Sequence, residues 1–184
     1  LILTKFFDGQ DVRKIGSGNI GATNVLRTGN KYLAATTLML DILKGYAPVV
    51  ITQQLFPEHI QLSALMAFLG HILPVWLKFK GGKGVATFAG ILFATSYGLI
   101  ALFIFTWLII ALIFKYSSLS SIFSSLTVLM AVLIKEKVPV TINLGIDESG
   151  NIKTLLFIIL ILIIFTHRGN ISNLKNGTEQ KIKL

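Results

Sequence analysis

The sequence predicts an all-α, polytopic integral membrane protein, and three observations support this fold class. Of its 184 residues, 53% are hydrophobic and 14% are charged, whereas soluble domains carry roughly 25% charged residues. The apolar residues fall in long blocks that approach or exceed the roughly 20 residues a spanning helix needs. The net charge of +9 lies mainly between these blocks, where basic residues orient helices. This placement argues against a nucleic-acid-binding protein.

The elements follow in order from the hydropathy. A polar, Gly-rich start covers residues 4–30, and apolar segments are expected over 31–56, 60–77, 85–114, the stretch that ends at Ile134, and 154–166. A polar loop is expected over 135–153. Residues 85–114 carry no charge and are too long for one comfortable span, so we expect a break at Ser96-Tyr97-Gly98. The result is about six membrane segments, some of them short or re-entrant.

The distribution of Lys and Arg predicts the topology. With 85–114 taken as two passes, one face receives 4–30 with Lys31, 78–84, 115–118 and 167–184, and these hold 13 of the 17 basic residues. Taking 85–114 as one span would put Lys115 and the basic tail on the other face. We therefore expect the two-pass arrangement, with the basic loops in the cytoplasm.

The chain begins at Leu1 rather than Met. Leu1 to Leu3 resemble the end of an apolar segment more than a signal peptide, which needs a basic start and a cleavage site. We expect a seventh helix to precede them in a longer protein, and one domain over residues 1–184.

Three polar, Gly-rich loops would share the cytoplasmic face. Polar backbone at membrane depth persists only where it is buried in protein or lines a wet cavity, so these loops are the first place to look for a site. The first loop runs from Ser17 to Arg27. Its glycines allow close backbone approach, its polar side chains can hydrogen-bond a ligand, and Arg27 can bind a phosphate bidentately. The alternative is a turn with helix caps.

The second loop runs from Phe79 to Thr87 and contains Gly81-Gly82-Lys83-Gly84. Glycine amides at a helix start, with a lysine, can form an anion cradle, although the spacing is not that of a Walker loop. The alternative is a flexible basic anchor.

The third loop begins at His167, and Asn170 lies about one helical turn later, so both side chains could face one pocket. The alternative interpretation of this segment is an ordinary basic tail.

Several single residues keep two interpretations. Asp41 and Lys44 lie in a membrane segment, where ionisable residues are usually functional, but they could also pair with each other. His71 beside Pro74 favours helix packing, and the serines at 117–121 favour helix capping over a place in the site. No metal-ligand cluster, no cysteine, no His-x4-Asp pair and no Gly-x-Ser-x-Gly elbow is present. The sequence therefore indicates no metal, no cofactor and no covalent thioester.

Together the three loops resemble the signatures of the acyl-phosphate:glycerol-3-phosphate acyltransferase family, the PlsY-type enzymes of bacterial membranes. The resemblance rests on Ser17-Gly18-Asn19-Ile20-Gly21-Ala22-Thr23-Asn24 through Arg27, on Gly70-His71 with Pro74 and the second loop, and on His167-Arg168 with Asn170, Ile171, Leu174, Gly177 and Glu179. Two departures are the first family helix, which is absent here, and Thr28-Gly29-Asn30-Lys31 in place of Thr-Leu-Gly-Lys. The resemblance covers nearly the whole chain and implies seven helices in the bacterial inner membrane, with the site facing the cytoplasm.

The resemblance also implies roles for individual residues. Ser17, Arg27, His167 and Asn170 are expected as catalytic or glycerol-phosphate ligands. Further substrate contacts are expected from Asn19, Gly21, Ala22, Thr23, Asn24, Gly81, Gly82, Lys83, Gly84 and Glu179. Among them, Gly81, Gly82, Gly84, Lys83 and Thr23 resemble the acyl-phosphate cradle, and Glu179 would brace the third loop.

The implied reaction is direct acyl transfer from acyl phosphate to the 1-position of glycerol-3-phosphate, which gives lysophosphatidic acid and inorganic phosphate, the first step of phospholipid synthesis. Both substrates, membrane lipids and an enzyme that makes acyl phosphate are the expected partners. The main alternative is a transporter of a small phosphorylated anion. A transporter should bind near the bilayer midplane and often has inverted repeats, and neither is seen. A non-catalytic lipid-binding scaffold would not need three Gly-rich loops.

Overall fold

The computed structural model describes residues 1–7, 9, 11–137 and 152–182, and the regular structure within these ranges is helical. The short N-terminal elements are α1 (Ile2–Phe7), η1 (Val12–Lys14), α2 (Ala22–Val25) and η2 (Leu26–Thr28). The bundle consists of α3 (Lys31–Leu55), η3 (Pro57–His59), α4 (Ile60–Ile72), η4 (Val75–Leu77), α5 (Val85–Thr95), α6 (Tyr97–Phe114), α7 (Ser117–Lys137) and α8 (Ile152–Thr166). The short helix α9 (Arg168–Lys175) follows α8 at a bend of 57°.

The all-α membrane fold class is confirmed, with a difference in the number of spans. Among the described residues, four helices are long and apolar enough to cross a membrane, or five if α8 and α9 count as one bent span. The break expected within 85–114 occurs at Ser96, but it divides the segment into 11 residues of α5 and 18 residues of α6. Helix α5 is therefore the short element.

Ser96 explains why the break falls where it does. Its backbone is extended, with φ −160° and ψ 116°, and its Oγ accepts a hydrogen bond from the Leu99 amide at 3.2 Å. This is N-cap geometry, which starts a new helix and ends the previous one. Of the polar loop expected over 135–153, residues 135–137 extend α7 and 152–153 begin α8; the remainder lies outside the described residues.

The core lies between α3, α4, α5, α6, α7 and α8. Phe68, Phe88, Leu99, Val128 and Ile159 each come from a different helix, and all are at most 1% exposed. The outer surfaces of the same helices expose many large apolar side chains, as expected for a protein whose solvent is lipid. The bundle thus holds its ends, and the loops on them, in fixed positions.

Helices α3 and α5 approach each other closely at two glycines. A Cβ on Gly45 would lie 2.0 Å from the carbonyl oxygen of Thr87, and one on Gly90 would lie 2.0 Å from the carbonyl oxygen of Ile42. Small residues that let helix backbones approach are typical of membrane interfaces. Because α5 begins at Val85, within the second loop, this contact fixes the loop relative to α3.

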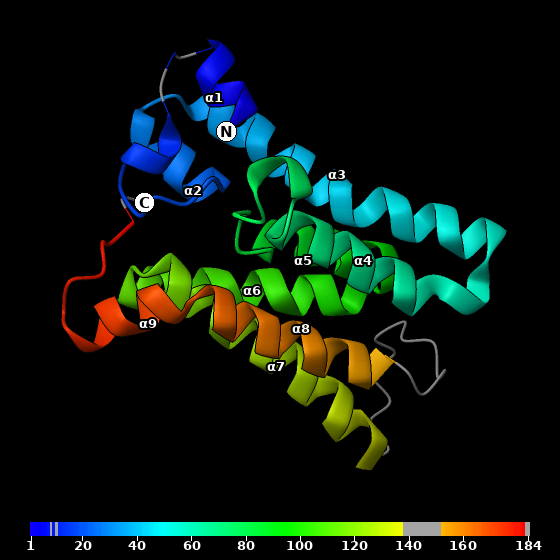
Figure 1. Cartoon of the computed structure of the whole chain (residues 1–184). Coiled ribbons are helices and arrows are strands. Elements are labelled where there is room, and N and C mark those ends of the chain that lie inside the picture. The colour runs from blue at the N-terminus through cyan, green and yellow to red at the C-terminus, as the bar shows by residue number, and fades with distance from the viewer. Residues whose placement is uncertain (8, 10, 138–151, 183–184) are drawn as a thin grey trace.

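The three polar loops gather at one end of the bundle. Figure 1 shows α2 and α9 at the end of the molecule opposite the turn between α3 and α4. Contacts between Arg27 and Gln180, Lys83 and Asn170, and Ser118 and Glu179 join the segments at this end. The shared face predicted from the sequence is therefore present.

Candidate functional site

Asn24 organises the first loop from its centre. Its buried side chain accepts a hydrogen bond from the Ser17 amide at 3.0 Å. Its Nδ2 donates to the carbonyls of Val12 (2.9 Å), Ile15 (3.0 Å) and Asn19 (2.6 Å). A buried amide satisfied by three stretches of backbone holds a loop in one conformation. In this structure Asn24 thus holds the backbone of Ser17 in place, and a direct substrate contact from Asn24 stays a prediction.

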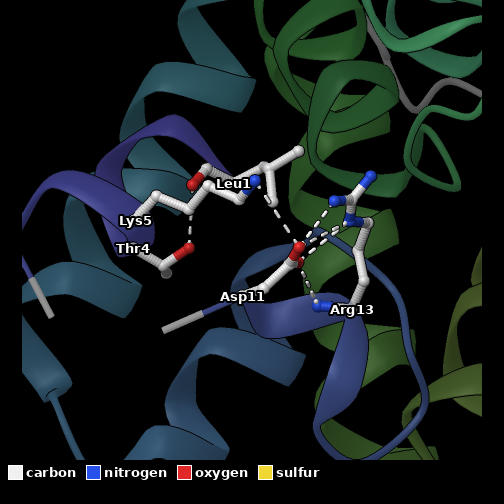
Figure 2. Close-up of polar contacts among 5 residues, drawn as sticks. All are labelled: Leu1, Thr4, Lys5, Asp11 and Arg13. Atoms are coloured by element: carbon white, nitrogen blue, oxygen red, sulfur yellow. Dashed lines mark hydrogen bonds and ion pairs between the residues drawn. The ribbon is translucent and has the colours of Figure 1, made fainter. Parts of the chain in front are cut away.

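The segment before this loop is held by an ion-pair cluster. Figure 2 shows Asp11 between Lys5 and Arg13. Asp11 accepts from Arg13 Nη2 at 2.5 Å and from the Arg13 amide at 3.1 Å, and Lys5 Nζ lies 3.6 Å away. The Arg13 guanidinium holds the pKa of the Asp11 carboxyl well below its usual range. Asp11 caps η1, and its contact with Lys5 connects α1 to the segment that leads into the first loop.

The first and third loops together line a small polar pocket of about 90 Å³. Its lining residues are Gly16, Ser17, Arg27, Asn173, Thr178, Glu179 and Gln180. Gly16 has a positive φ of 54°, and a Cβ there would lie 2.5 Å from Asn24 Oδ1 and 2.7 Å from the Arg27 side chain. Only glycine therefore lets the loop close against the guanidinium. Arg27 Nη1 donates to the Gln180 side chain, and Nη2 to the Gln180 carbonyl at 3.5 Å.

A hydrogen-bonded chain that includes Glu179 of the pocket lining joins the second loop, the third loop and α7. Lys83 Nζ donates to Asn170 Oδ1. Asn170 Nδ2 then donates to Glu179 Oε1 at 2.7 Å, and the Ser118 hydroxyl donates to the same oxygen at 2.7 Å. The backbone carbonyl of Lys83 accepts from Thr166 Oγ1 at 3.2 Å. Three segments distant in sequence, around Lys83, Ser118 and residues 166–179, therefore converge on one polar cluster.

The electrostatics of this cluster centre on Lys83, in the connection between η4 and α5. Burial lowers the pKa of Lys83 from 10.5 to about 8; the charge of Glu179 raises it and that of Arg27 lowers it. The ammonium is therefore the charged form at neutral pH but loses its proton in mildly alkaline solution. With Arg27 it gives the site two cations, against the single carboxylate of Glu179.

His167 and Asn170 lie at the start of α9. Both are buried, with exposures of 2% and 9%. His167 Nδ1 lies 2.8 Å from the Ile163 carbonyl. That carbonyl can only accept, so we assign the proton to Nδ1, which leaves Nε2 as an acceptor.

The glycines of the second loop have a different environment from the one expected. The Gly81 amide donates to the Ile72 carbonyl at 3.2 Å, and the Gly82 amide donates to the His71 carbonyl at 3.3 Å. In this structure these two amides complete the end of α4. Gly84, with φ 83°, packs on Phe68, whose ring atom Cε2 would be 2.4 Å from a Cβ. A ligand role for these glycines stays a prediction.

The structure brings some of the expected residues together and leaves others at the margin. Ser17, Arg27 and Glu179 line the pocket, and Lys83 and Asn170 adjoin it through Glu179. Asn19, Gly21, Ala22 and Thr23 are half-buried in the first loop outside the pocket lining. Within the described ranges, no three His, Asp or Glu side chains form a group that could hold a metal.

Sequence reasoning missed part of the site. The pocket is also lined by Asn173, Thr178 and Gln180. These residues lie in a polar tail whose sequence has no periodic pattern that would identify them as site residues. Ser118, interpreted as a helix cap, instead donates to Glu179. The neighbouring serines at 120, 121, 124 and 125 donate to backbone carbonyls four residues earlier. Ser118 therefore differs from them in its position, which brings its hydroxyl to Glu179.

Comparison with known proteins gives consistent matches. The model of the family described as Glycerol-3-phosphate acyltransferase matches residues 1–177. A glycerol-3-phosphate acyltransferase of Pelagibacter ubique is 50% identical over 184 residues, which are 100% of this chain and 89% of the relative. One of Mesorhizobium japonicum is 48% identical over 182 residues, with 99% and 87% covered.

Two crystal structures also match, both of PlsY (YgiH), an integral membrane glycerol 3-phosphate acyltransferase. The glycerol 3-phosphate form superposes with a TM-score of 0.86 at 34% identity, covering 99% of this chain and 86% of that one. The lysophosphatidic acid form gives a TM-score of 0.82 at 33% identity, with 99% and 86% covered.

Proposed function

Since this chain belongs to the glycerol-3-phosphate acyltransferase family, we propose that acyl phosphate is its donor and that the acyl group goes to the 1-position. Acylation of glycerol-3-phosphate by an integral membrane enzyme is supported by the family, by close relatives and by both structural matches. The same findings do not support the transporter alternative. An acyltransferase of this kind belongs to phospholipid biosynthesis.

The observation that carries the proposal is the arrangement of two cations around a small polar pocket. Arg27 lines the pocket directly, and Lys83 is linked to the pocket by its hydrogen bond to Asn170, which in turn donates to Glu179 of the lining. A phosphate matches both the charge and the hydrogen-bonding capacity of this site. We assign Ser17, Arg27, His167 and Asn170 to glycerol-3-phosphate, and Lys83 with the first turn of α5 to the phosphate of the donor.

The bound Gln180 side chain indicates how Arg27 can engage a ligand. The guanidinium donates to two oxygens of Gln180, and a phosphate presents oxygens in a similar pattern with a negative charge. The guanidinium donates as a cation to either ligand, but a phosphate adds the attraction of opposite charges that the neutral Gln180 oxygens lack. A phosphate group should therefore displace the Gln180 amide from Arg27.

The reaction requires little activation of the nucleophile. The C1 hydroxyl oxygen forms a bond to the acyl carbonyl carbon, the bond from that carbon to the phosphate oxygen breaks, and inorganic phosphate leaves with the electron pair. The hydroxyl proton has three available acceptors: the departing phosphate, the phosphate of the substrate, and Nε2 of His167. Because an acyl phosphate has a good leaving group, positioning supplies most of the catalysis, typically about 7–11 kcal/mol.

A donor comparison tests the proposal. The purified protein is supplied with labelled glycerol-3-phosphate and with acyl phosphate, acyl-CoA or acyl-carrier protein in parallel. We expect labelled lysophosphatidic acid from acyl phosphate only. Product from acyl-CoA or acyl-carrier protein, with none from acyl phosphate, would reject the donor assignment while leaving the acyltransferase intact. If acyl phosphate is the donor, an enzyme that makes it is the natural partner.

The proposed location is the bacterial inner membrane with the site in the cytoplasm. Its support is the excess of Lys and Arg on the loops at the site end, since basic loops remain on the cytoplasmic side during insertion.

A further inference from the structure

Three ionisable side chains form a cluster between α3 and α4, beside the second loop. The buried Asp41 carboxylate accepts a hydrogen bond from Lys44 Nζ at 2.8 Å. His71 Nδ1 lies 3.7 Å from the same oxygen of Asp41, and the His71 side chain is 7% exposed. Asp41 and His71 are buried, whereas the Lys44 side chain is 58% exposed. Buried ionisable groups within a membrane bundle are costly, which makes Asp41 and His71 candidates for a functional role. The pairing of Asp41 with Lys44 left open by the sequence is therefore present, and His71 joins it.

The opposite edge of the His71 ring packs against the second loop. A Cβ on Gly82 would lie 2.2 Å from His71 Nε2. The Gly82 amide also donates to the His71 carbonyl at 3.3 Å. One residue therefore contacts Gly82 with both its ring and its backbone. The Asp41 carboxylate lies on the Nδ1 side of the ring, at 3.7 Å and opposite Gly82, where it can favour one orientation of the imidazole.

The next residue after Gly82 is Lys83. Its ammonium donates to Asn170, and its carbonyl accepts from Thr166, so its backbone position decides whether its side chain reaches the site. A displacement of about 1 Å far from the chemistry can cost roughly 100-fold in rate.

We propose that His71, oriented by Asp41, is a positioning residue that holds the Gly82–Lys83 backbone where Lys83 can reach Asn170 and a bound phosphate. The inference rests on the proposed function only in giving Lys83 a phosphate to bind. In this proposal the Asp41 carboxylate orients the His71 ring. Without Asp41 the ring would lose its fixed orientation, and Gly82 would lose the neighbour that holds it in place.

A double-mutant cycle between residues 71 and 82 tests direct coupling. Gly82→Ala should lower kcat/KM by about tenfold or more in the wild-type background, since the new Cβ meets the His71 ring. In the His71→Ala background the same change should cost about twofold or less, because the ring is gone. Multiplicative losses in the double variant would overturn the proposal.

Asp41 is tested in the same way. Asp41→Asn should lower kcat/KM when His71 is present and have little further effect in His71→Ala. Glutamine at position 71 can reach the place of Nε2, whereas asparagine is too short. His71→Gln should therefore retain more activity than His71→Asn, and the reverse order would contradict the proposal.

The matched control is His59→Ala. His59 is exposed on η3, and its neighbour Glu58 at 3.6 Å is exposed too, so activity should be unchanged. Thermal unfolding in detergent identifies any variant that fails to fold. If His71→Ala does not fold, the comparison of His71→Gln with His71→Asn tests the proposal instead. A wild-type protein that is inactive with acyl phosphate would reject the donor assignment. An active wild-type protein without coupling between 71 and 82 would reject the positioning role alone.

Discussion

At the scale of single residues, Arg27 is the group on which the pocket depends most directly. Arg27→Ala removes the guanidinium that lines the pocket, and we expect kcat/KM for glycerol-3-phosphate to fall by about 100-fold, the cost of losing a hydrogen-bonded charge. Ser17→Ala should also reduce turnover severely, because Asn24 presents Ser17 at the pocket. Steady-state kinetics of the purified variants measure both losses.

The control for Arg27 is Arg168→Ala. Arg168 lies beside His167, but its guanidinium stacks on the Phe165 ring at 4.5 Å and it does not line the pocket. Its loss should change kcat/KM by less than about twofold, since exposed contacts of this kind contribute little. Equal losses in Arg27→Ala and Arg168→Ala would mean that general positive charge, rather than the pocket guanidinium, binds the substrate.

The lowered pKa of Lys83 predicts that kcat/KM depends on pH. Its charged form is the protonated one, and burial lowers its pKa to about 8. As the pH rises through 8 the ammonium is lost, so kcat/KM should decline on the alkaline side, by about tenfold per pH unit once Lys83 is mostly neutral. Lys83→Arg keeps its charge above pH 12, so its alkaline decline should disappear, at a lower plateau. An identical alkaline decline in Lys83→Arg would exclude Lys83 as its source.

At the scale of elements, the close approach of α3 and α5 is the contact most open to test. Gly45→Ala puts a methyl group 2.0 Å from the Thr87 carbonyl oxygen, so the helices must separate, at a cost of about 1–3 kcal/mol. We expect a lower Tm in detergent. Gly70→Ala is the matched control, because Gly70 lies in α4 with nothing within 4 Å of a Cβ. Its Tm should not fall, and an equal drop in both variants would exclude the helix contact as the cause.

The same elements show how far sequence reasoning reaches. Hydropathy located the helices and the break at Ser96, because a long uncharged stretch and a capping residue are local signals. The same break accounts for the unequal lengths of α5 and α6, since Ser96 lies nearer the start of the stretch than its end. The contact between Gly45 and α5 could not be predicted from the sequence, because a glycine inside an apolar helix does not indicate which helix packs against it.

The site also contains residues that local sequence patterns predict and contacts that only the folded chain creates. Ser17, Arg27, Lys83 and Asn170 could be nominated because their loops carry dense local patterns. The contact between Arg27 and Gln180 joins residues 153 positions apart, and nothing local to Gln180 distinguishes it from the rest of a polar tail. The orientation of His71 toward Gly82 likewise depends on how α4 ends, which only the folded chain defines.

At the scale of the whole molecule, the asymmetry of basic residues predicts orientation, and the chain is suited to a direct test because it contains no cysteine. Single cysteines replace exposed Lys175, on α9 at the site end, and exposed Glu58, on η3 at the opposite end. In intact cells, a membrane-impermeant maleimide should label Glu58→Cys but reach Lys175→Cys only after lysis. The unmodified protein, which should remain unlabelled, is the control.

The chemistry of the substrate makes this orientation consequential. Glycerol-3-phosphate is charged at neutral pH and does not cross the hydrocarbon core unaided, since an unpaired charge is expensive there. A site that opens to the cytoplasm would meet substrate dissolved there, while the apolar sides of the bundle lie in lipid, where the acyl product can remain. Labelling of Lys175→Cys in intact cells, with protection of Glu58→Cys, would place the pocket on the other side and reject this orientation.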